Sequence, residues 1–211
     1  MNWLPLPFIP LILACILALI HFRRQNRVWK WFSTYLFFSL VVQITASILT
    51  RFAINNLVLS HLLTWITPLW LAGFYYQLFR MYIPGAFLWV PAGVVGLLSI
   101  YNSIFIQDIF TFNSYSLTLL SVFLLILSLS TFIVLLEKDI NAETAGLNWV
   151  NSGLFLYHAS NLVFFYFGDY LMNAWMTLSL FRQAWLPHTF FSFTMYSLFV
   201  VGLWRSSRRL N

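Results

Sequence analysis

Charged residues are scarce in this chain: only 8% of its 211 residues are Asp, Glu, Lys or Arg. A soluble domain is about one quarter charged, because its surface needs ionised side chains. Here 61% of the residues are hydrophobic and 20% are aromatic, which is typical of an integral membrane protein. The net charge of +6 does not indicate nucleic acid, since the basic residues stand at the ends of apolar runs rather than on one patch.

Cysteine and the common catalytic motifs are also missing. The single Cys15 excludes an intrachain disulfide and a cysteine metal cluster. No HExxH, Walker A or GxSxG motif occurs, so we expect no enzymatic activity, no catalytic residue, no metal and no cofactor. No charged residue falls in the middle of an apolar run, which argues against ion-coupled transport and proton pumping. The only lysines, Lys30 and Lys138, flank apolar runs, so a retinal Schiff base is excluded.

Seven apolar runs are long enough to cross the bilayer hydrocarbon, which takes about 20 residues of helix. Continuous runs of this length predict helices, because the strands of a transmembrane barrel alternate over about 10 residues. We therefore expect an all-α fold, a polytopic membrane protein whose residues 1–211 form one seven-transmembrane-helix bundle. The predicted spans are 3–22, 31–52, 57–79, 86–106, 116–136, 148–168 and 184–204.

The basic residues predict the orientation of this bundle. Cytoplasmic loops of membrane proteins carry an excess of Lys and Arg. Only Arg51 and Arg182 fall on one side of the predicted spans, which we take as the outside. The N-terminus is then outside and the C-terminus cytoplasmic, in the inner (cytoplasmic) membrane. The cytoplasmic side collects Arg23, Arg24, Arg27, Lys30, Arg80, Lys138, Arg205, Arg208 and Arg209.

Polar residues are unusually frequent in the predicted 148–168 span. At about 100° per residue of helix, Asn148, Asn151, His158 and Asn161 fall on one stripe about 140° wide. Such a stripe normally faces other helices or a wet cavity. Two interpretations stay open: hydrogen bonds between helices that hold the bundle together, or a ligand- or proton-responsive pocket. Tyr75 of the 57–79 span is expected opposite the stripe.

Two further histidines, His61 and His188, begin the 57–79 and 184–204 spans on the predicted outer side. A metal or a haem between two histidines is one reading of this pair. Nothing fixes their separation, however, and no nearby acidic residue completes a ligand set. We therefore interpret them as interfacial histidines.

The polar stripe stands in the segment LNWVNSGLFLYHASNLVFFYFGDYL at 147–171. This segment resembles a pattern in small seven-span membrane proteins of the Bacteroidota. In that pattern an aromatic residue, Asn-Ser-Gly, a second aromatic residue and a later Asn-aromatic run mark the sixth span; an aromatic would fit it better than His158 does. The end of the chain, FVVGLWRSSRR at 199–209, is similar to the seventh span of that group. The matching residues are Trp149, Asn151, Ser152, Gly153, Tyr157, Asn161 and the run 164–166.

The resemblance implies a signalling or structural role, because similar segments occur beside or joined to histidine kinases. We therefore expect a non-enzymatic sensor or receptor-like module that acts through a separate cytoplasmic partner. Besides the lipid bilayer, the expected partner is a histidine kinase or another membrane protein. Two alternatives remain: a facilitative small-solute transporter with two three-helix bundles joined by the fourth span, or a small membrane subunit of a larger complex.

Overall fold

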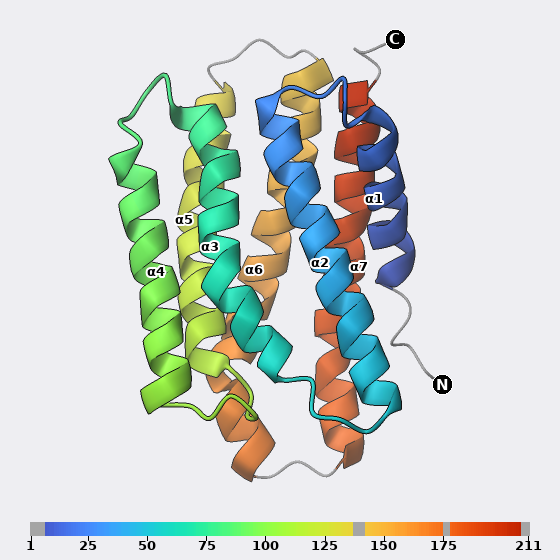
Figure 1. Ribbon diagram of the computed structural model, residues 1–211, viewed down its shortest axis with the longest axis vertical. Coiled ribbons are helices and arrows are strands. Elements are labelled where there is room, and N and C mark those ends of the chain that lie inside the picture. Colours follow the sequence, from blue (N-terminus) through green and yellow to red (C-terminus); the bar gives the residue numbers. More distant parts are fainter. Residues whose placement is uncertain (1–6, 137–141, 175–177, 208–211) are drawn as a thin grey trace.

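The computed structural model describes residues 7–136, 142–174 and 178–207. This part of the chain consists of seven α-helices and their connections. The helices are α1 Phe8–His21, α2 Arg27–Arg51, α3 Val58–Phe79, α4 Ala86–Phe105, α5 Ser114–Leu136, α6 Ala142–Ala174 and α7 Leu178–Ser207 (Figure 1).

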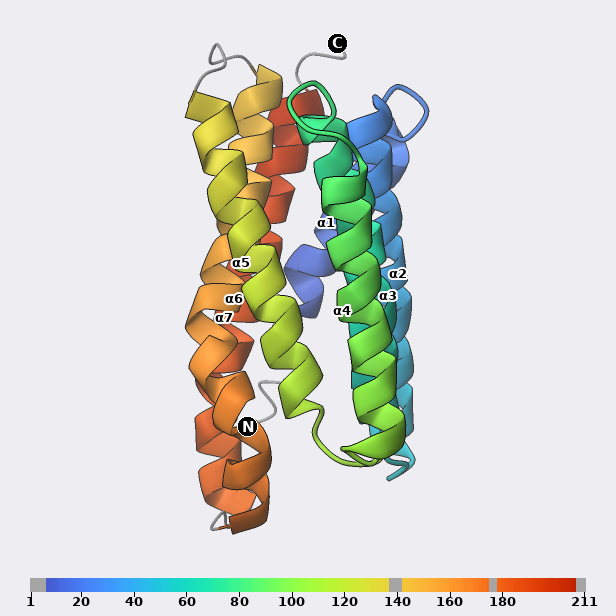
Figure 2. The same ribbon diagram turned by 90° about the vertical axis from the view of Figure 1, so that its left-hand side faces the viewer.

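The helices form a closed ring in which each packs against its neighbours in the chain, and α1 packs against α7. α3 also packs against α5 across the ring. Two layers result, with α2, α3 and α4 on one side and α5, α6 and α7 on the other (Figure 2). Among the described residues, the backbones of α3 and α6 do not approach each other closely, so the two layers meet there through side chains.

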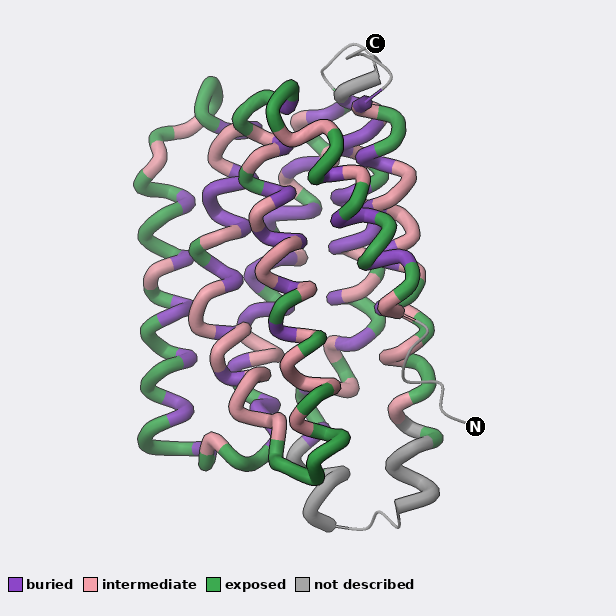
Figure 3. Tube along the Cα trace, turned by 45° about the vertical axis from the view of Figure 1, so that its right-hand side comes forward, coloured by how far each residue is buried: buried purple, intermediate pink, exposed green. Residues whose placement is uncertain are grey.

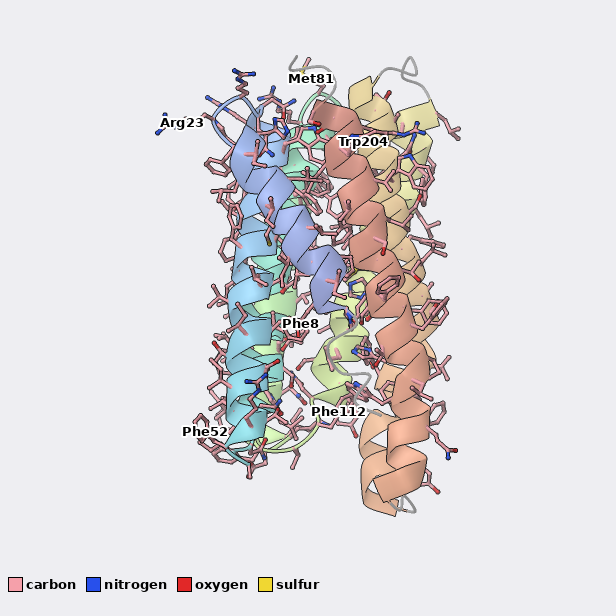
Figure 4. All side chains as sticks on the ribbon, turned by 90° about the vertical axis from the view of Figure 1, so that its right-hand side faces the viewer. Phe8, Arg23, Phe52, Met81, Phe112 and Trp204 are labelled. Atoms are coloured by element: carbon pink, nitrogen blue, oxygen red, sulfur yellow. The ribbon has the colours of Figure 1, made fainter. Side chains whose placement is uncertain are left out.

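The short helix α1 closes one edge of the two layers. Its 14 residues extend over about 21 Å at 1.5 Å per residue, whereas α2 has 25 residues. Figure 4 shows α1 between α2 and α7, near Arg23 and far from Phe52. Phe112 lies beyond the Phe8 end of α1 in the same interval (Figure 4). α1 therefore covers only part of the length of this edge.

Local sequence signals explain where α2 begins and ends. Asn26 is the N-cap, and its side-chain oxygen accepts a hydrogen bond from the Trp29 backbone N–H at 3.2 Å. After the last turn Ala53 adopts a left-handed conformation with φ of 54°, and the Ile54 N–H donates to the Leu49 carbonyl at 2.9 Å. This is the Schellman arrangement, in which the left-handed position is usually a glycine.

The surface of the bundle is apolar along most of its length. Phe87, Leu97 and Phe105, all on α4, are 70%, 68% and 70% exposed. Buried positions instead lie on the inward faces of the helices (Figure 3). Five helical segments are long and apolar enough to cross a membrane: Arg27–Arg51, Val58–Phe79, Ala86–Phe105, Ser114–Leu136 and Trp185–Ser207. The chain is therefore a multi-pass integral membrane protein, because so large an apolar surface is not stable in water.

The predicted all-α seven-helix bundle is confirmed, with differences in helix length. α6 has 33 residues and α7 has 30, where the spans 148–168 and 184–204 were expected. Counting apolar residues locates only the hydrocarbon-spanning part of a helix, so it misses turns that continue beyond it. α6 is not among the five most apolar segments, because the polar residues of its stripe lower its mean hydropathy.

The two ends of the bundle differ in charge. At one end, termed the basic end, lie Arg23 and the exposed Met81 and Trp204 (Figure 4). The end that carries Phe52 is termed the opposite end, and Arg51 and Asp108 are exposed there. The sequence grouped Lys138, Arg208 and Arg209 with the basic end, but these residues lie outside the described part. The basic end carries Arg23, Arg24, Arg27, Lys30, Arg80 and Arg205.

α6 and α7 cross closely at two glycines near the basic end. A Cβ atom on Gly146 would lie 2.7 Å from the Gly202 carbonyl oxygen, and a Cβ on Gly202 would lie 2.8 Å from the Gly146 carbonyl oxygen. Real Cβ atoms essentially never approach a backbone atom this closely. Small residues at such crossings allow backbone contact where lipid provides no hydrophobic driving force. The glycines therefore set the spacing of α6 and α7.

We expect Gly202→Ala to destabilise the bundle by about 1–3 kcal/mol, because its methyl group would have to push two backbones apart. The measurement is denaturant unfolding in detergent micelles. Gly93→Ala is the matched control, since nothing lies within 4 Å of a Cβ at this helical position. Equal stability of the two variants would show that the crossing has room for the methyl group.

Candidate functional site

The α6 stripe faces other helices rather than lipid. Asn151, His158 and Asn161 are buried, at 1%, 6% and 1% exposure. Their side chains form hydrogen bonds with three helices, α3, α5 and α7. Asn148 is half-buried and forms no hydrogen bond with the described residues. The structure thus brings three of the four predicted stripe residues into contact with the neighbouring helices.

Asn151 connects the two layers at the centre of the bundle. The Tyr75 hydroxyl of α3 donates to Oδ1 of Asn151 at 3.0 Å and lies 3.0 Å from the hydroxyl of Ser128 on α5. Nδ2 of Asn151 donates to the Ser128 backbone carbonyl at 2.9 Å. Tyr75 and Ser128 are fully buried. Tyr75 therefore lies opposite the stripe, and three helices share one hydrogen-bonded cluster.

His158 contacts α5 about two turns farther along α6. Its Nδ1 lies 3.0 Å from the Ser121 hydroxyl oxygen. The one proton of that hydroxyl is donated to the Leu117 carbonyl at 2.8 Å. The hydroxyl oxygen therefore accepts from His158, which places the ring proton on Nδ1. Nε2 of His158 has no hydrogen-bond partner among the described residues.

Asn161 contacts His188 on α7. Nδ2 of Asn161 donates to the Tyr157 carbonyl at 2.8 Å, so Oδ1 faces Nδ1 of His188, 3.1 Å away. An amide oxygen only accepts, and His188 is therefore the donor through Nδ1. Aromatic rings surround this imidazole: its centroid lies 4.4 Å from that of Trp185 and 5.6 Å from that of Tyr157. Phe164 and Phe165 also contact it.

A second polar network, which the sequence did not predict, lies at the opposite end. It joins α3, α4, the α4–α5 connection and the start of α5. Nδ2 of Asn102 lies within 3.2 Å of the oxygens of Gln107, Asn113 and Ser116, and Nδ2 of Asn113 donates to the Thr64 hydroxyl at 2.8 Å. All of these side chains are buried, at 7% exposure or less.

Backbone groups fix the direction of every amide in this network. Oε1 of Gln107 accepts from the Tyr115 N–H, and Nε2 donates to the Phe112 carbonyl. The Thr64 hydroxyl donates to the His61 carbonyl, so it accepts from Nδ2 of Asn113. With Gln107 and Asn113 both presenting oxygen, Asn102 must present its NH₂ group to them. Oδ1 of Asn102 is then buried without a donor among the described residues.

His61 belongs to this network and not to a site shared with His188. Its Nδ1 lies 2.6 Å from the Ser103 hydroxyl, and its Nε2 donates to the Thr111 carbonyl at 3.3 Å. Both ring nitrogens are occupied, and the residue is fully buried. Within the described ranges no group of three or more His, Cys, Asp or Glu residues could hold a metal ion. His61 therefore bonds to Ser103 and Thr111, whereas His188 bonds to Asn161 of α6, and the two histidines do not form a ligand pair.

The sequence signal for the second network was present in the segment 101–116, which contains Asn, Ser, Gln, Asp and Thr in close succession. Counting angles along one helix cannot show that these residues lie together. They belong to the end of α4, the α4–α5 connection and the start of α5. Among the residues whose side chains the structure describes, no Asp, Glu, Lys or Arg is buried, and both polar clusters consist of uncharged side chains.

The comparisons with known proteins give no relative for this arrangement. No protein-family model, curated protein or solved structure matches the chain.

A double-mutant cycle tests the contact between the layers. We expect Tyr75→Phe and Asn151→Leu to be coupled by about 0.6 kcal/mol, and by no more than about 1.7 kcal/mol, the range for hydrogen bonds between membrane helices. The free energy of unfolding in detergent micelles is the measurement. Tyr76→Phe paired with Asn151→Leu is the control cycle, since Tyr76 makes no contact with the stripe. Additive effects in the first cycle would contradict the contact.

Removing Gln107 tests the second network. Gln107→Leu leaves the Tyr115 N–H and the Phe112 carbonyl without their side-chain partner, so we expect a loss of about 1–3 kcal/mol in unfolding free energy. The neighbouring Asp108→Asn is the control, because Asp108 is exposed and a change of within about 0.5 kcal/mol is usual there. A stable Gln107→Leu variant would refute the fixed directions of the amides.

Proposed function

We propose that this integral membrane protein is a non-enzymatic sensor or receptor-like module in the inner (cytoplasmic) membrane. The basic end is placed in the cytoplasm, in accordance with the excess of Lys and Arg in cytoplasmic loops. A change in helix packing passes from the bundle to a separate partner at this end, such as a histidine kinase or another membrane protein. The polar contacts of α6 carry the proposal.

The first support is the position of α6 among its neighbours. Through Asn151 it contacts α3 and α5, through His158 it contacts α5, and through Asn161 it contacts α7. A rotation or shift of α6 would therefore alter hydrogen bonds to three helices together. Discrete rearrangements of packed helices are a common basis of switching.

The second support is the way the layers are joined. Beside the Tyr75–Asn151 hydrogen bond, the T-shaped contact of Phe32 on α2 with Phe199 on α7 connects them, with ring centroids 4.9 Å apart. Individual hydrogen bonds between membrane helices contribute about 0.6 kcal/mol on average. The layers also meet where α3 and α4 pack against α5, so the proposed shift in packing is limited to the side where α6 and α7 face α2 and α3.

Facilitative transport remains the competing proposal. It predicted two three-helix bundles joined by the fourth span. Instead α4 lies in one layer with α3 and α2, and α1 packs against α2 and α7 at the edge of the two layers. Counterflow uptake of small solutes into liposomes containing the purified protein separates the proposals, because a sensor gives no uptake.

Spin-label distances at the basic end test the sensor proposal. Labels are attached to cysteines at Met81 and Trp204 in a Cys15→Ala background, both sites being exposed. We expect Asn151→Leu to change the ratio of two distance populations about 3- to 20-fold, which corresponds to a loss of about 0.6–1.7 kcal/mol. The distances are measured by pulsed electron–electron double resonance in lipid nanodiscs.

Ser160→Leu is the matched control for this experiment. Ser160 is an exposed residue on the same helix, away from the stripe, so its replacement should leave the distances unchanged. Lower stability of Asn151→Leu with an unchanged distance distribution would mean that the stripe only holds the bundle together, and the sensor proposal would then fail.

A further inference from the structure

His61 differs from His158, which is also buried, in what its two ring nitrogens face. Nδ1 of His61 lies 2.6 Å from the Ser103 hydroxyl, and Nε2 lies 3.3 Å from the Thr111 carbonyl oxygen. A carbonyl oxygen only accepts, so Nε2 carries a proton. In His158 a hydrogen-bond partner among the described residues faces Nδ1 only. His61 therefore has an oxygen next to each ring nitrogen, as a doubly protonated ring requires.

The Ser103 hydroxyl allows Nδ1 of His61 to act either as an acceptor or as a donor. The hydroxyl proton can point to Nδ1 or to the Ser99 carbonyl oxygen, 2.8 Å away. In the first arrangement the ring is neutral and the hydroxyl donates to Nδ1. In the second, Nδ1 is protonated and donates to the hydroxyl oxygen, which also accepts from Nε1 of Trp65 at 3.1 Å. Rotation of one hydroxyl therefore keeps both ring nitrogens hydrogen-bonded in either protonation state.

The α4–α5 connection lies between this ring and the water at the opposite end. Burial opposes a charge on the His61 ring, whereas the negative charge of Asp108 in this connection favours it. Asp108 and Thr111 are both exposed, so protons from water need to cross only this connection. The helices that pack against α3 carry further ionisable side chains near this end, and these are exposed: Arg51 of α2, Tyr101 of α4 and Tyr115 of α5.

α3 connects His61 with the contact between the two layers. His61 lies at the start of this helix, and Tyr75, which donates to Asn151 of α6, lies about four turns farther along. Pro68 lies between them and cannot donate to the Thr64 carbonyl, so α3 bends more easily here than elsewhere. A change in the hydrogen bonds of His61 can therefore alter the angle between the two parts of α3 and the position of Tyr75 relative to Asn151.

We propose that His61 is a proton-binding site through which the bundle responds to acidity outside the membrane. At neutral pH the Ser103 hydroxyl donates to Nδ1. In acidic surroundings a proton from hydronium binds Nδ1, and the hydroxyl turns to the Ser99 carbonyl. The ring then carries a positive charge in a network that otherwise consists of uncharged side chains. The inference names the stimulus of the proposed sensor, so it rests on that proposed function and on its placement of the opposite end outside the membrane.

Nitrogen chemical shifts of the histidine rings test whether His61 binds the proton. The full chain with ¹⁵N-labelled histidine is studied in lipid nanodiscs from about pH 7.5 to about pH 4.5, a range that includes the ordinary titration of histidine. We expect Nδ1 of His61 to change from an acceptor to a protonated nitrogen, while the His158 ring stays neutral. A His61 ring that stays neutral at the lowest pH would overturn the inference.

Ser103→Ala removes the acceptor that the protonated ring needs at Nδ1. A hydrogen bond to a charged group is stronger than one to a neutral group, so we expect protonation of His61 in this variant to need a pH about one unit lower. Ser99→Ala is the matched control, because Ser99 is also buried on α4 and its hydroxyl donates to the Val95 carbonyl. Equal titration of His61 in the two variants would contradict the role of the Ser103 hydroxyl.

The spin-label pair of the sensor proposal tests whether the bound proton reaches the basic end. We expect a change from about pH 7.5 to about pH 5 to alter the ratio of the two distance populations at least about threefold, the effect of one hydrogen bond between helices. His61→Gln should abolish this response, because its amide keeps a donor toward the Thr111 carbonyl but does not titrate. His21→Gln is the matched control and should keep the response, since His21 ends α1 at the basic end.

A pH response that is absent, or that persists in His61→Gln, would overturn the inference. The sensor proposal itself is tested by Asn151→Leu at constant pH, and the nitrogen shifts report protonation independently of helix packing. Failure of the proton site and failure of the sensor proposal are therefore distinguishable.

Discussion

A helical bundle in lipid has to satisfy its polar groups from within, because hydrocarbon offers neither donors nor acceptors. The cluster of Tyr75, Ser128 and Asn151 meets this constraint at the place where the two layers come together. α3 and α6 do not approach through their backbones in the described part, so their relative position depends on side chains of sufficient length. Tyr75 has this length and presents a hydroxyl at its end.

The two flanks of α6 serve different purposes. On the flank toward α7, Gly146 and Gly153 allow close packing against Gly202 and Phe199. On the other flank, Asn151 and His158 form directed hydrogen bonds with longer reach, and Asn161 of the same stripe bonds to His188 on α7. Close backbone packing has one favourable spacing, whereas a hydrogen-bonded side chain can exchange partners at modest cost. Fixed spacing on one flank and exchangeable partners on the other are what a helix needs if it is to move as a unit.

The sequence predicted the seven helices because each apolar run is long and uninterrupted, and it predicted the stripe because Asn151, His158 and Asn161 share one helix. It could not predict their partners. Ser128 lies in a leucine-rich run that gives no sign of its role, and the pairing of Asn161 with His188 depends on the rotation of α7. Asn148 has the correct angle but forms no hydrogen bond within the described part of the chain, since it stands next to the Gly146 crossing, where α7 is the close neighbour. Angle alone therefore identifies a face and not its contacts.

Three histidines, of which His61 and His158 are buried and His188 is half-buried, show how much hydrogen bonds reveal beyond burial. His61 is held by a hydroxyl and a carbonyl in a packed network. For His158 and His188, packing accounts for Nδ1 alone. Aromatic rings surround the His188 imidazole, so Nδ1 is the atom through which this ring and that of His158 bond to neighbouring helices within the described residues.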